Sequence, residues 1–215
     1  MQAVILTKSA MEKNGVKGSC TTAIDLESGK MVRFVSDKAG SPIPYRLVNY
    51  QKLDVVDVRV LDACPLTPQT ENLFVDPKSF RNLGGYRYDV TQLFQYNAKR
   101  EFPDGKFIGE GCKKYDTVEN FRHSIEIAYT TQFCLERSDH NRTKAHFRVQ
   151  RKWHRYLSVT DFDYFDWGDT EWDWRELGDA WIVATIPTEP YLTQQQQNLG
   201  YFVFVAAIYP VHRRT

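Results

Sequence analysis

Cations and an aromatic side chain recur at β-strand spacing in the segment Lys144–Leu157, KAHFRVQRKWHRYL. On a single extended strand, one face would carry Lys144, His146, Arg148, Gln150, Lys152 and His154, and the other would carry Ala145, Phe147, Val149 and Trp153. Lysine and arginine attract phosphates and an exposed indole stacks on bases, so these residue types fit a single-stranded nucleic-acid interface. The candidate nucleic-acid-binding residues here are Lys144, Arg148, Lys152 and Trp153. A polar face that meets only solvent has the same pattern, and both interpretations stay open.

A second group of cations lies on or beside a predicted hairpin early in the sequence. Strand-forming residues at Thr21–Leu26 and Met31–Val35 flank a turn in which Gly29 can take a positive φ. In the return strand Phe34 should point inward and Arg33 outward, because neighbouring residues of a strand lie on opposite faces. We therefore add three candidate phosphate contacts: Lys8, Lys30 and Arg33.

An acidic, tryptophan-rich stretch follows the basic segment. Eight acidic residues lie between Asp161 and Asp179, together with Trp167, Trp172 and Trp174. Asp161, Asp163, Asp166 and Glu171 could hold a divalent cation, because hard metal ions prefer several oxygen ligands. Their spacing is not that of an EF-hand, which favours a solvated acidic loop, and we predict no metal site. The stretch is also a partner of opposite charge for the basic segment.

A cysteine nucleophile is the other catalytic possibility. Cys134 with His123 or His140 would supply a thiolate and a base, as in cysteine hydrolases. No catalytic signature surrounds this cysteine, which favours a buried structural thiol. The four cysteines are far apart and form no Cys-x-x-Cys pair, as expected for reduced thiols in a cytoplasm. We predict a protein without catalytic residues and without a cofactor.

The overall charge gives no default preference for nucleic acid. Over 215 residues, 28 Lys and Arg balance 27 Asp and Glu, which leaves a formal net charge of +1. Any nucleic-acid binding must therefore come from local patches. The sequence begins without a cationic leader, and no apolar run approaches the roughly 20 residues that span a bilayer. We expect a cytoplasmic protein that does not associate with membranes.

Several predicted elements would position these candidates. Apolar residues at helical spacing behind a capping aspartate predict a helix over Asp89–Arg100. The segment Tyr115–Arg137 fits both periodicities, and we expect a helix first and a strand afterwards. Ala180–Ile186 and Tyr201–Ile208 predict two apolar strands, joined by a loop that contains the run QQQQ.

Six short segments of this chain together resemble one known family. They are AVILTKS, TTAIDLESGKMVRFVS, KLDVVDVRVLDACPLTPQTEN, RYLSVTDFDYF, LGDAWIVATIPTEPY and GYFVFVAAIYP. The sequence is similar to the dual-OB-containing domain family, a group of prokaryotic proteins and modules associated with conflict and antiviral defence systems. The resemblance runs from end to end and is least clear over residues 80–143.

The resemblance implies a mainly β protein with a minor helical part. Two OB-like β-barrels in tandem would occupy residues 1–75 and 140–215, joined by a partly helical insert at 76–139. OB barrels bind single-stranded nucleic acid by combining a basic groove with stacking aromatics. We therefore expect a non-catalytic module that binds single-stranded DNA or RNA in a prokaryotic defence or nucleic-acid-processing system, with an effector protein as a further partner.

Two other functions remain as alternatives. A protein-interaction scaffold or adaptor subunit is the first, because OB-like barrels also dock proteins. A cysteine- or metal-dependent hydrolase is the less favoured second.

Overall fold

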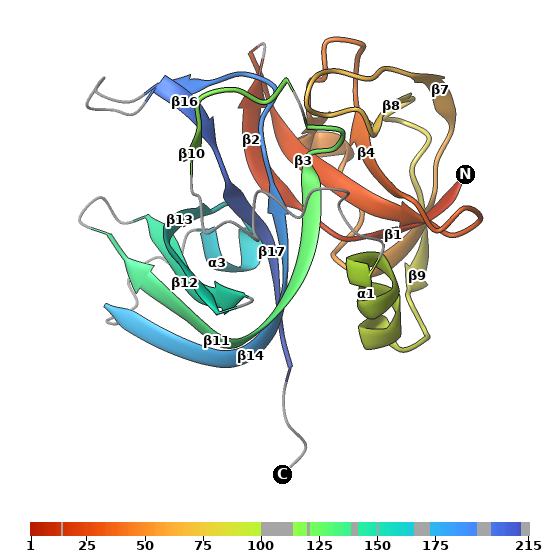
Figure 1. The fold of residues 1–215 in the computed structure, drawn as a ribbon. Coiled ribbons are helices and arrows are strands. Elements are labelled where there is room, and N and C mark those ends of the chain that lie inside the picture. Colours follow the sequence, from red (N-terminus) through yellow and green to blue (C-terminus); the bar gives the residue numbers. More distant parts are fainter. Residues whose placement is uncertain are drawn as a thin grey trace.

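The computed structural model of this chain describes residues 1–13, 15–99, 114–119, 121–138, 142–149, 151–165, 173–192 and 199–211. Its strands form two β units that lie side by side (Figure 1). The helical elements within the described residues are α1 (Val90–Lys99), the short α3 (Phe162–Phe165) and the 3-10 turn η1 (Tyr45–Leu47). The prediction of a mainly β fold with a minor helical part is confirmed. No helix in these ranges is long and apolar enough to cross a bilayer.

The first unit is a nine-stranded sheet that curls round on itself. Its strands are β1 (Gln2–Ile5), β2 (Ser9–Lys13), β3 (Val16–Asp25), β4 (Met31–Val35), β5 (Ile43–Pro44), β6 (Asp54–Asp57), β7 (Val60–Ala63), β8 (Asn72–Val75) and β9 (Arg81–Gly85). The strand order is β7-β8-β4-β3-β1-β6-β9, with β4 and β8 parallel. Only Val58 and Arg59 separate β6 from β7, so the chain itself links the two sides of the sheet in an OB-like barrel.

The second unit is a closed five-stranded barrel. Its strands are β11 (Ile125–Arg137), β12 (Thr143–Val149), β13 (Lys152–Val159), β14 (Trp174–Thr185) and β17 (Phe204–Pro210), in the order β11-β12-β13-β17-β14. The third and fifth strands of this barrel, β13 and β17, run parallel, as β4 and β8 do in the first unit. A separate three-stranded sheet joins β10 (Lys114–Tyr115), β16 (Leu199–Phe202) and β15 (Tyr191–Leu192). The chain therefore contains two OB-like barrels in tandem.

The region before the second barrel differs from the sequence prediction. Helix α1 forms where a helix was expected, and Asp89 Oδ1 accepts a hydrogen bond from the Thr91 amide at 2.8 Å. No helix forms between Tyr115 and Arg137 in the part that the structure describes. Instead β11 begins at Ile125 and pairs with both β12 and β14, so the second barrel starts 15 residues before position 140. Pairing on both sides favours the strand periodicity of this ambiguous segment over its helical periodicity.

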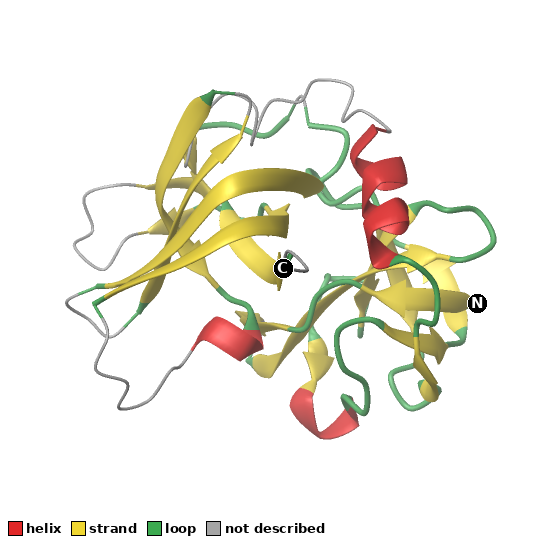
Figure 2. Ribbon diagram, turned by 90° about the horizontal axis from the view of Figure 1, so that it is seen from below, coloured by secondary structure: helices red, strands yellow, loops and turns green. Residues whose placement is uncertain are grey.

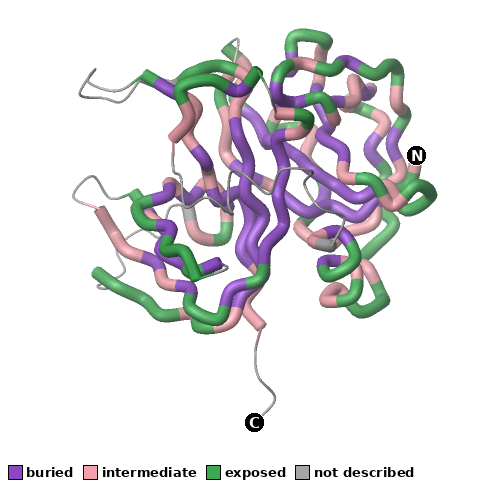
Figure 3. Tube along the Cα trace, in the orientation of Figure 1, coloured by how far each residue is buried: buried purple, intermediate pink, exposed green. Residues whose placement is uncertain are grey.

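Each barrel has its own apolar interior, and a third apolar cluster lies where the barrels meet. Phe34 lies in the interior of the first barrel, and Phe133 and Phe147 lie in the interior of the second. The third cluster joins Leu6 and Ile24 of the first barrel to five residues of the second and to one residue of α1: Ile125, Ile127, Trp181, Val183, Ala207 and Phe94. Buried residues accordingly lie on both sides of the boundary between the barrels (Figure 3).

Helix α1 lies at this boundary (Figure 2). Its Phe94 is 1% exposed, and the Phe94 ring lies 5.8 Å from Trp181 and 4.9 Å from Tyr209, measured between ring centroids. The helix thus covers one side of the apolar cluster.

Polar contacts also connect the two barrels. Lys52 Nζ lies 2.7 Å from Asp161 Oδ2, and that buried carboxylate also accepts a hydrogen bond from the Ile208 amide at 2.8 Å. Two further hydrogen bonds add to this pair: the Ala10 amide donates to the Thr160 carbonyl at 2.9 Å, and the Tyr209 hydroxyl donates to the Leu6 carbonyl. These contacts satisfy polar groups that would otherwise be buried without partners.

We predict that replacing Lys52 destabilises the protein much more than replacing Lys38. Both lysines lie 2.7 Å from an aspartate oxygen, but the Lys52–Asp161 pair is almost fully buried, whereas the side chains of Lys38 and Asp62 are 67% and 52% exposed. Lys52→Met leaves Asp161 charged and buried, and should lower the free energy of unfolding by about 3 kcal/mol. Lys38→Met should leave urea unfolding unchanged, because exposed ion pairs contribute little. Similar urea midpoints for the two variants would contradict the importance of this buried pair.

Candidate nucleic-acid interface

The basic segment Lys144–Leu157 forms a hairpin and not one strand. Strands β12 and β13 pair antiparallel, and Arg151 in the turn between them has φ of 68°. In this register Arg148 lies directly opposite Trp153. Directly opposed residues of an antiparallel pair lie on the same face, and both residues are exposed, so the two side chains project from the outside of the barrel.

The predicted division of this segment into two faces is therefore wrong beyond the turn. His154 pairs with Phe147, is fully buried, and stacks on the Phe147 ring with 4.9 Å between centroids. Trp153, expected on the apolar face, is 43% exposed. The reason is that β12 and β13 pair as an antiparallel hairpin, which a continuous alternation over the segment does not allow for.

The hairpin brings together four of the predicted site residues. Arg148, Lys152 and Trp153 are exposed, and Lys144 is half-buried, with its ammonium donating to Ser158 Oγ at 2.8 Å. Arg155 adds a cation that was not predicted, because its guanidinium lies 5.5 Å from the centroid of the Trp153 ring. A cation at this distance from an indole is attracted to the ring. The outer face of β12 and β13 thus combines positive charge with an exposed aromatic ring.

A β-bulge adds another aromatic residue to this face. Ala145 pairs with Leu157 and Phe147 with His154, so two residues of β13, Arg155 and Tyr156, lie opposite the single residue His146. The extra residue turns both Arg155 and Tyr156 outward, since a bulge changes the direction of side chains along its strand. Tyr156 is 55% exposed and has φ of 60°, which is rare for a bulky residue.

Tyr156 belongs to a cluster of three rings. The His146 ring lies 4.8 Å from Tyr156 and 5.1 Å from Trp174, measured between centroids. His146 is buried, whereas Trp174 is 50% exposed. Burial lowers the pKa of His146, although Glu136 Oε2, 2.6 Å from His146 Nε2, favours the protonated form. Burial is the larger effect, and it favours the neutral imidazole.

Sequence reasoning did not assign Arg155, Tyr156 or Trp174 to the site. For Arg155 and Tyr156 the only signal is that two residues, and not one, separate the buried residues His154 and Leu157. Strict alternation would place a single outward residue between them. Trp174 was grouped with the acidic stretch, but it lies on β14, where it pairs with Glu136 of β11. A bulge and a pairing between distant strands cannot be inferred from one strand at a time.

The candidate residues of the first barrel do not form a similar surface. Lys30 is exposed in the turn between β3 and β4. Lys8 is half-buried, donates to Gln51 Oε1 at 3.0 Å, and has its ammonium 5.9 Å from the centroid of the Phe162 ring. These two lysines remain predicted contacts.

The prediction that Arg33 points into solvent is wrong. Arg33 is 2% exposed, donates to Cys20 Sγ and, at 2.7 Å, to Ser124 Oγ, and lies 3.5 Å from Glu71 Oε1. The alternation itself is right, because Phe34 points into the barrel and Arg33 away from it. On the outer face of β4, however, Arg33 contacts Ser124, which lies directly before the first strand of the second barrel. The second barrel therefore separates this face from solvent.

The two barrels therefore use equivalent faces in different ways. Strands β3 and β4 take the topological places that β12 and β13 take in the second barrel, and in OB barrels these two strands form the usual ligand-binding face. In the first barrel Ile24 and Arg33 on this face contact the second barrel. The β12–β13 hairpin lies on the far side of the second barrel from the first (Figure 1). Its face is the one of the two that remains open.

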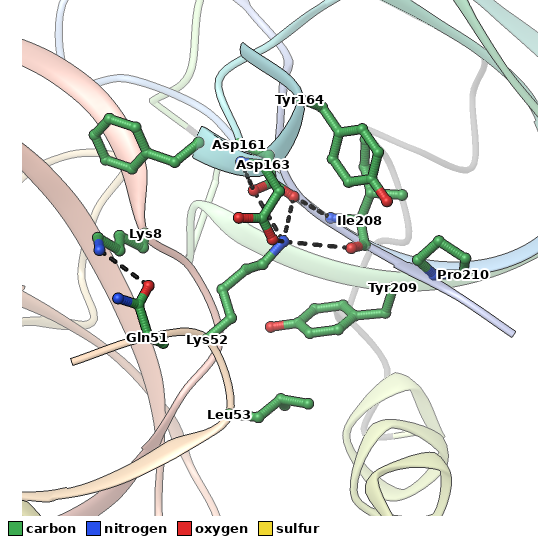
Figure 4. Close-up of a pocket in the computed structure, with 11 residues that line it drawn as sticks. Lys8, Gln51, Lys52, Leu53, Asp161, Asp163, Tyr164, Ile208, Tyr209 and Pro210 are labelled. Atoms are coloured by element: carbon green, nitrogen blue, oxygen red, sulfur yellow. Dashed lines mark hydrogen bonds and ion pairs between the residues drawn. The ribbon is translucent and has the colours of Figure 1, made fainter. Parts of the chain in front are cut away.

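A cavity of about 490 Å³ lies at the boundary of the barrels, next to Lys8. Figure 4 shows Lys52 pointing into it, with its ammonium 2.7 Å from Asp161 and 2.7 Å from Asp163. The same ammonium lies 5.7 Å and 5.3 Å from the ring centroids of Tyr164 and Tyr209. Burial raises the pKa of Asp161 in spite of this lysine. Both carboxylates pair with this lysine, so the group serves as a contact between the barrels.

The catalytic alternatives gain no support from the described residues. Lys52 occupies two of the proposed metal ligands, Asp161 and Asp163, while Asp166 and Glu171 lie outside the described residues. No group of three or more metal-binding side chains converges within the part of the chain that the structure describes. Burial and the charge of Glu176 raise the pKa of Cys134, which favours the thiol over the thiolate.

Comparison with known proteins identifies a family for this chain. A family model described as the dual OB-containing domain matches residues 1–208. No curated protein and no solved structure matches the chain.

We predict that His154 makes the fold sensitive to mild acid. Burial lowers the pKa of His154 to about 4, whereas the unfolded chain titrates near 6.5, so stability falls as the pH drops from 6.5 towards 4. By pH 5 this group alone should cost about 2 kcal/mol of unfolding free energy. His154→Phe retains a ring on Phe147 without a titrating group. In urea unfolding, the advantage of the variant over the wild type should grow by this amount between pH 7.5 and 5, and a constant difference would contradict the assignment.

Proposed function

Because this chain belongs to the dual OB-containing domain family, we propose that it binds single-stranded DNA or RNA through the outer face of β12 and β13. The observation that carries the proposal is the exposed Trp153 ring, with Arg148 directly opposite and the Arg155 guanidinium 5.5 Å from its centroid. This face belongs to the two strands that form the usual ligand site of OB barrels.

The chemistry of the face suits an unpaired strand. Arg148 and Lys152 are exposed cations that attract phosphates, and the Trp153 ring offers a flat apolar surface for one base, a stacking contact usually worth about 1–3 kcal/mol. Stacking of this kind requires a base that is not paired within a duplex. With a net charge of only +1 for the whole chain, binding must depend on this local arrangement.

The proposal assigns the two barrels different tasks. The second barrel contacts the nucleic acid, and the first supports it from the opposite side. Lys30 and Lys8 would then make at most peripheral contacts, and Arg33 none, because it is buried between the barrels.

The proposal includes a binding role without catalysis, in a prokaryotic defence or nucleic-acid-processing system. The raised pKa of Cys134 supports this, because a nucleophilic cysteine needs its thiolate form. In this role the chain would bring an effector protein to the nucleic-acid strand that it binds. An adaptor that binds proteins alone is the alternative, and the binding experiment below separates the two.

We predict that Trp153→Ala weakens binding of a fluorescein-labelled oligonucleotide of about 12 residues by roughly 5- to 150-fold, because one stacked base is lost. Arg148→Ala with Lys152→Ala should reduce the slope of log affinity against log salt by about 1.4, since two phosphate contacts are removed. Fluorescence polarisation in salt from about 50 to 200 mM measures both effects.

A double variant of the first barrel, Lys17→Ala with Lys38→Ala, removes the same charge from exposed positions elsewhere. It should retain the wild-type affinity and salt slope. Absence of binding at low salt to both DNA and RNA would overturn the proposal, as would equal losses in the two double variants. Thermal melting of each variant verifies that it is folded.

A further inference from the structure

A cluster of rings with a carboxylate lies on the outside of the second barrel, beside Trp153. The buried His146 ring forms its floor, and the exposed rings of Tyr156 and Trp174 lie against it, with centroids 4.8 and 5.1 Å away. The two exposed rings come from β13 and β14, Glu136 comes from β11, and His146 comes from β12. These four strands are neighbours in the barrel and form one surface. Exposed aromatic rings that gather in this way usually mark a binding site.

The backbone at Tyr156 supports a role in binding. A φ of 60° is costly for a tyrosine, and such conformations persist where the surrounding structure imposes them, often at ligand sites. Here the β-bulge opposite His146 imposes it. The bulge directs the Tyr156 ring over the imidazole, where it is 55% exposed. A base can stack on a ring presented in this way.

Glu136 determines which part of a nucleotide this surface accepts. Its side chain is 27% exposed, with Oε2 2.6 Å from His146 Nε2. Glu136 pairs directly with Trp174 on β14 and with Lys144 on β12, so the three residues share one face. A negative charge repels phosphates, so the backbone of a bound strand cannot pass over Glu136. Hydrogen-bond donors on a base edge are attracted instead.

We propose that Tyr156, Trp174 and Glu136 form a subsite for one unpaired guanine base, on the floor provided by His146. This inference rests on the proposed nucleic-acid binding and adds base specificity to it. Guanine carries two adjacent donors, N1–H and the N2 amino group, which match the two oxygens of a carboxylate. Next to them O6 accepts, and Lys144, opposite Glu136, is a donor.

The other bases match this arrangement less well. Adenine and cytosine each present one amino group beside a ring nitrogen that accepts, and the lone pair of this nitrogen would repel a carboxylate oxygen. Thymine and uracil present one N–H between two carbonyl oxygens. A bidentate contact therefore selects guanine, and contacts of this kind discriminate between bases by roughly 5- to 150-fold.

Oligothymidylates of about ten residues, with G, A, C or T at the central position, test the proposal by fluorescence polarisation, and the matching uridylates test it for RNA. A single guanine avoids four-stranded assemblies. We expect the oligonucleotide with G to bind the wild type at least about fivefold more tightly than the other three. Glu136→Gln should remove this preference, because the amide offers only one acceptor.

Glu176→Gln is the matched control. Glu176 lies two residues from Trp174 on β14, pairs with Cys134, and is exposed, so this variant removes the same charge from the same barrel without changing the contact with His146. It should retain the guanine preference. Both variants should bind oligothymidylate at least as well as the wild type does, since each loses a negative charge.

The outcomes separate this inference from the proposed function. Equal affinities for all four oligonucleotides, or a guanine preference that persists in a folded Glu136→Gln protein, would overturn the guanine subsite and leave the nucleic-acid interface intact. Failure of every oligonucleotide to bind would overturn the proposed function itself. Loss of the preference in Glu136→Gln but not in Glu176→Gln supports the subsite.

Discussion

Contact between the outer faces of the two barrels is the constraint on which the rest of this structure depends. Ile125, Ile127 and Trp181 on the outside of the second barrel pack against Leu6 and Ile24 on the outside of the first. The polar contacts around this cluster follow from it, because a lysine and an aspartate buried at the boundary must pair with each other. The boundary therefore fixes the register of one barrel on the other and determines which surfaces stay in solvent.

This packing makes two similar barrels unequal. Burial of the β3–β4 face places Arg33 among Cys20, Ser124 and Glu71, where its charge stabilises the fold and is closed to ligands. The β12–β13 face, which has the same place in the topology, points away from the boundary and keeps Trp153 in solvent. The two barrels thus present one candidate binding face between them. That face lies on β12 and β13 because the equivalent face of the first barrel, on β3 and β4, contacts the second barrel.

Local pattern predicted helix α1 and the β character of most segments, and predicted the breaks and surroundings of the strands poorly. Tyr201–Ile208, expected as one strand, is divided between β16 and β17, which belong to different sheets. The alternation around Arg33 correctly gave its direction, yet nothing in that hairpin reveals its contact with Ser124, which lies just before β11. The segment Lys144–Leu157 was rightly expected to be β, but its turn and bulge decide the side on which Trp153 and Tyr156 lie. Likewise the apolar residues after Tyr115 fit two periodicities, and only pairing with β14 selects the strand. The register of a strand and the burial of its outer face depend on partners that are distant in the sequence. A short segment does not contain those partners.

The placement of Phe94 has a consequence for how the protein unfolds. Helix α1 follows the first barrel in the chain, yet its buried ring packs on Trp181 and Tyr209 of the second. Separating the barrels would expose this ring, the apolar cluster around it and an uncompensated charge on Asp161 at the same time. Neither barrel can unfold alone without these losses, so the chain should unfold in a single cooperative transition. Two separately expressed halves would each expose an apolar patch that favours aggregation.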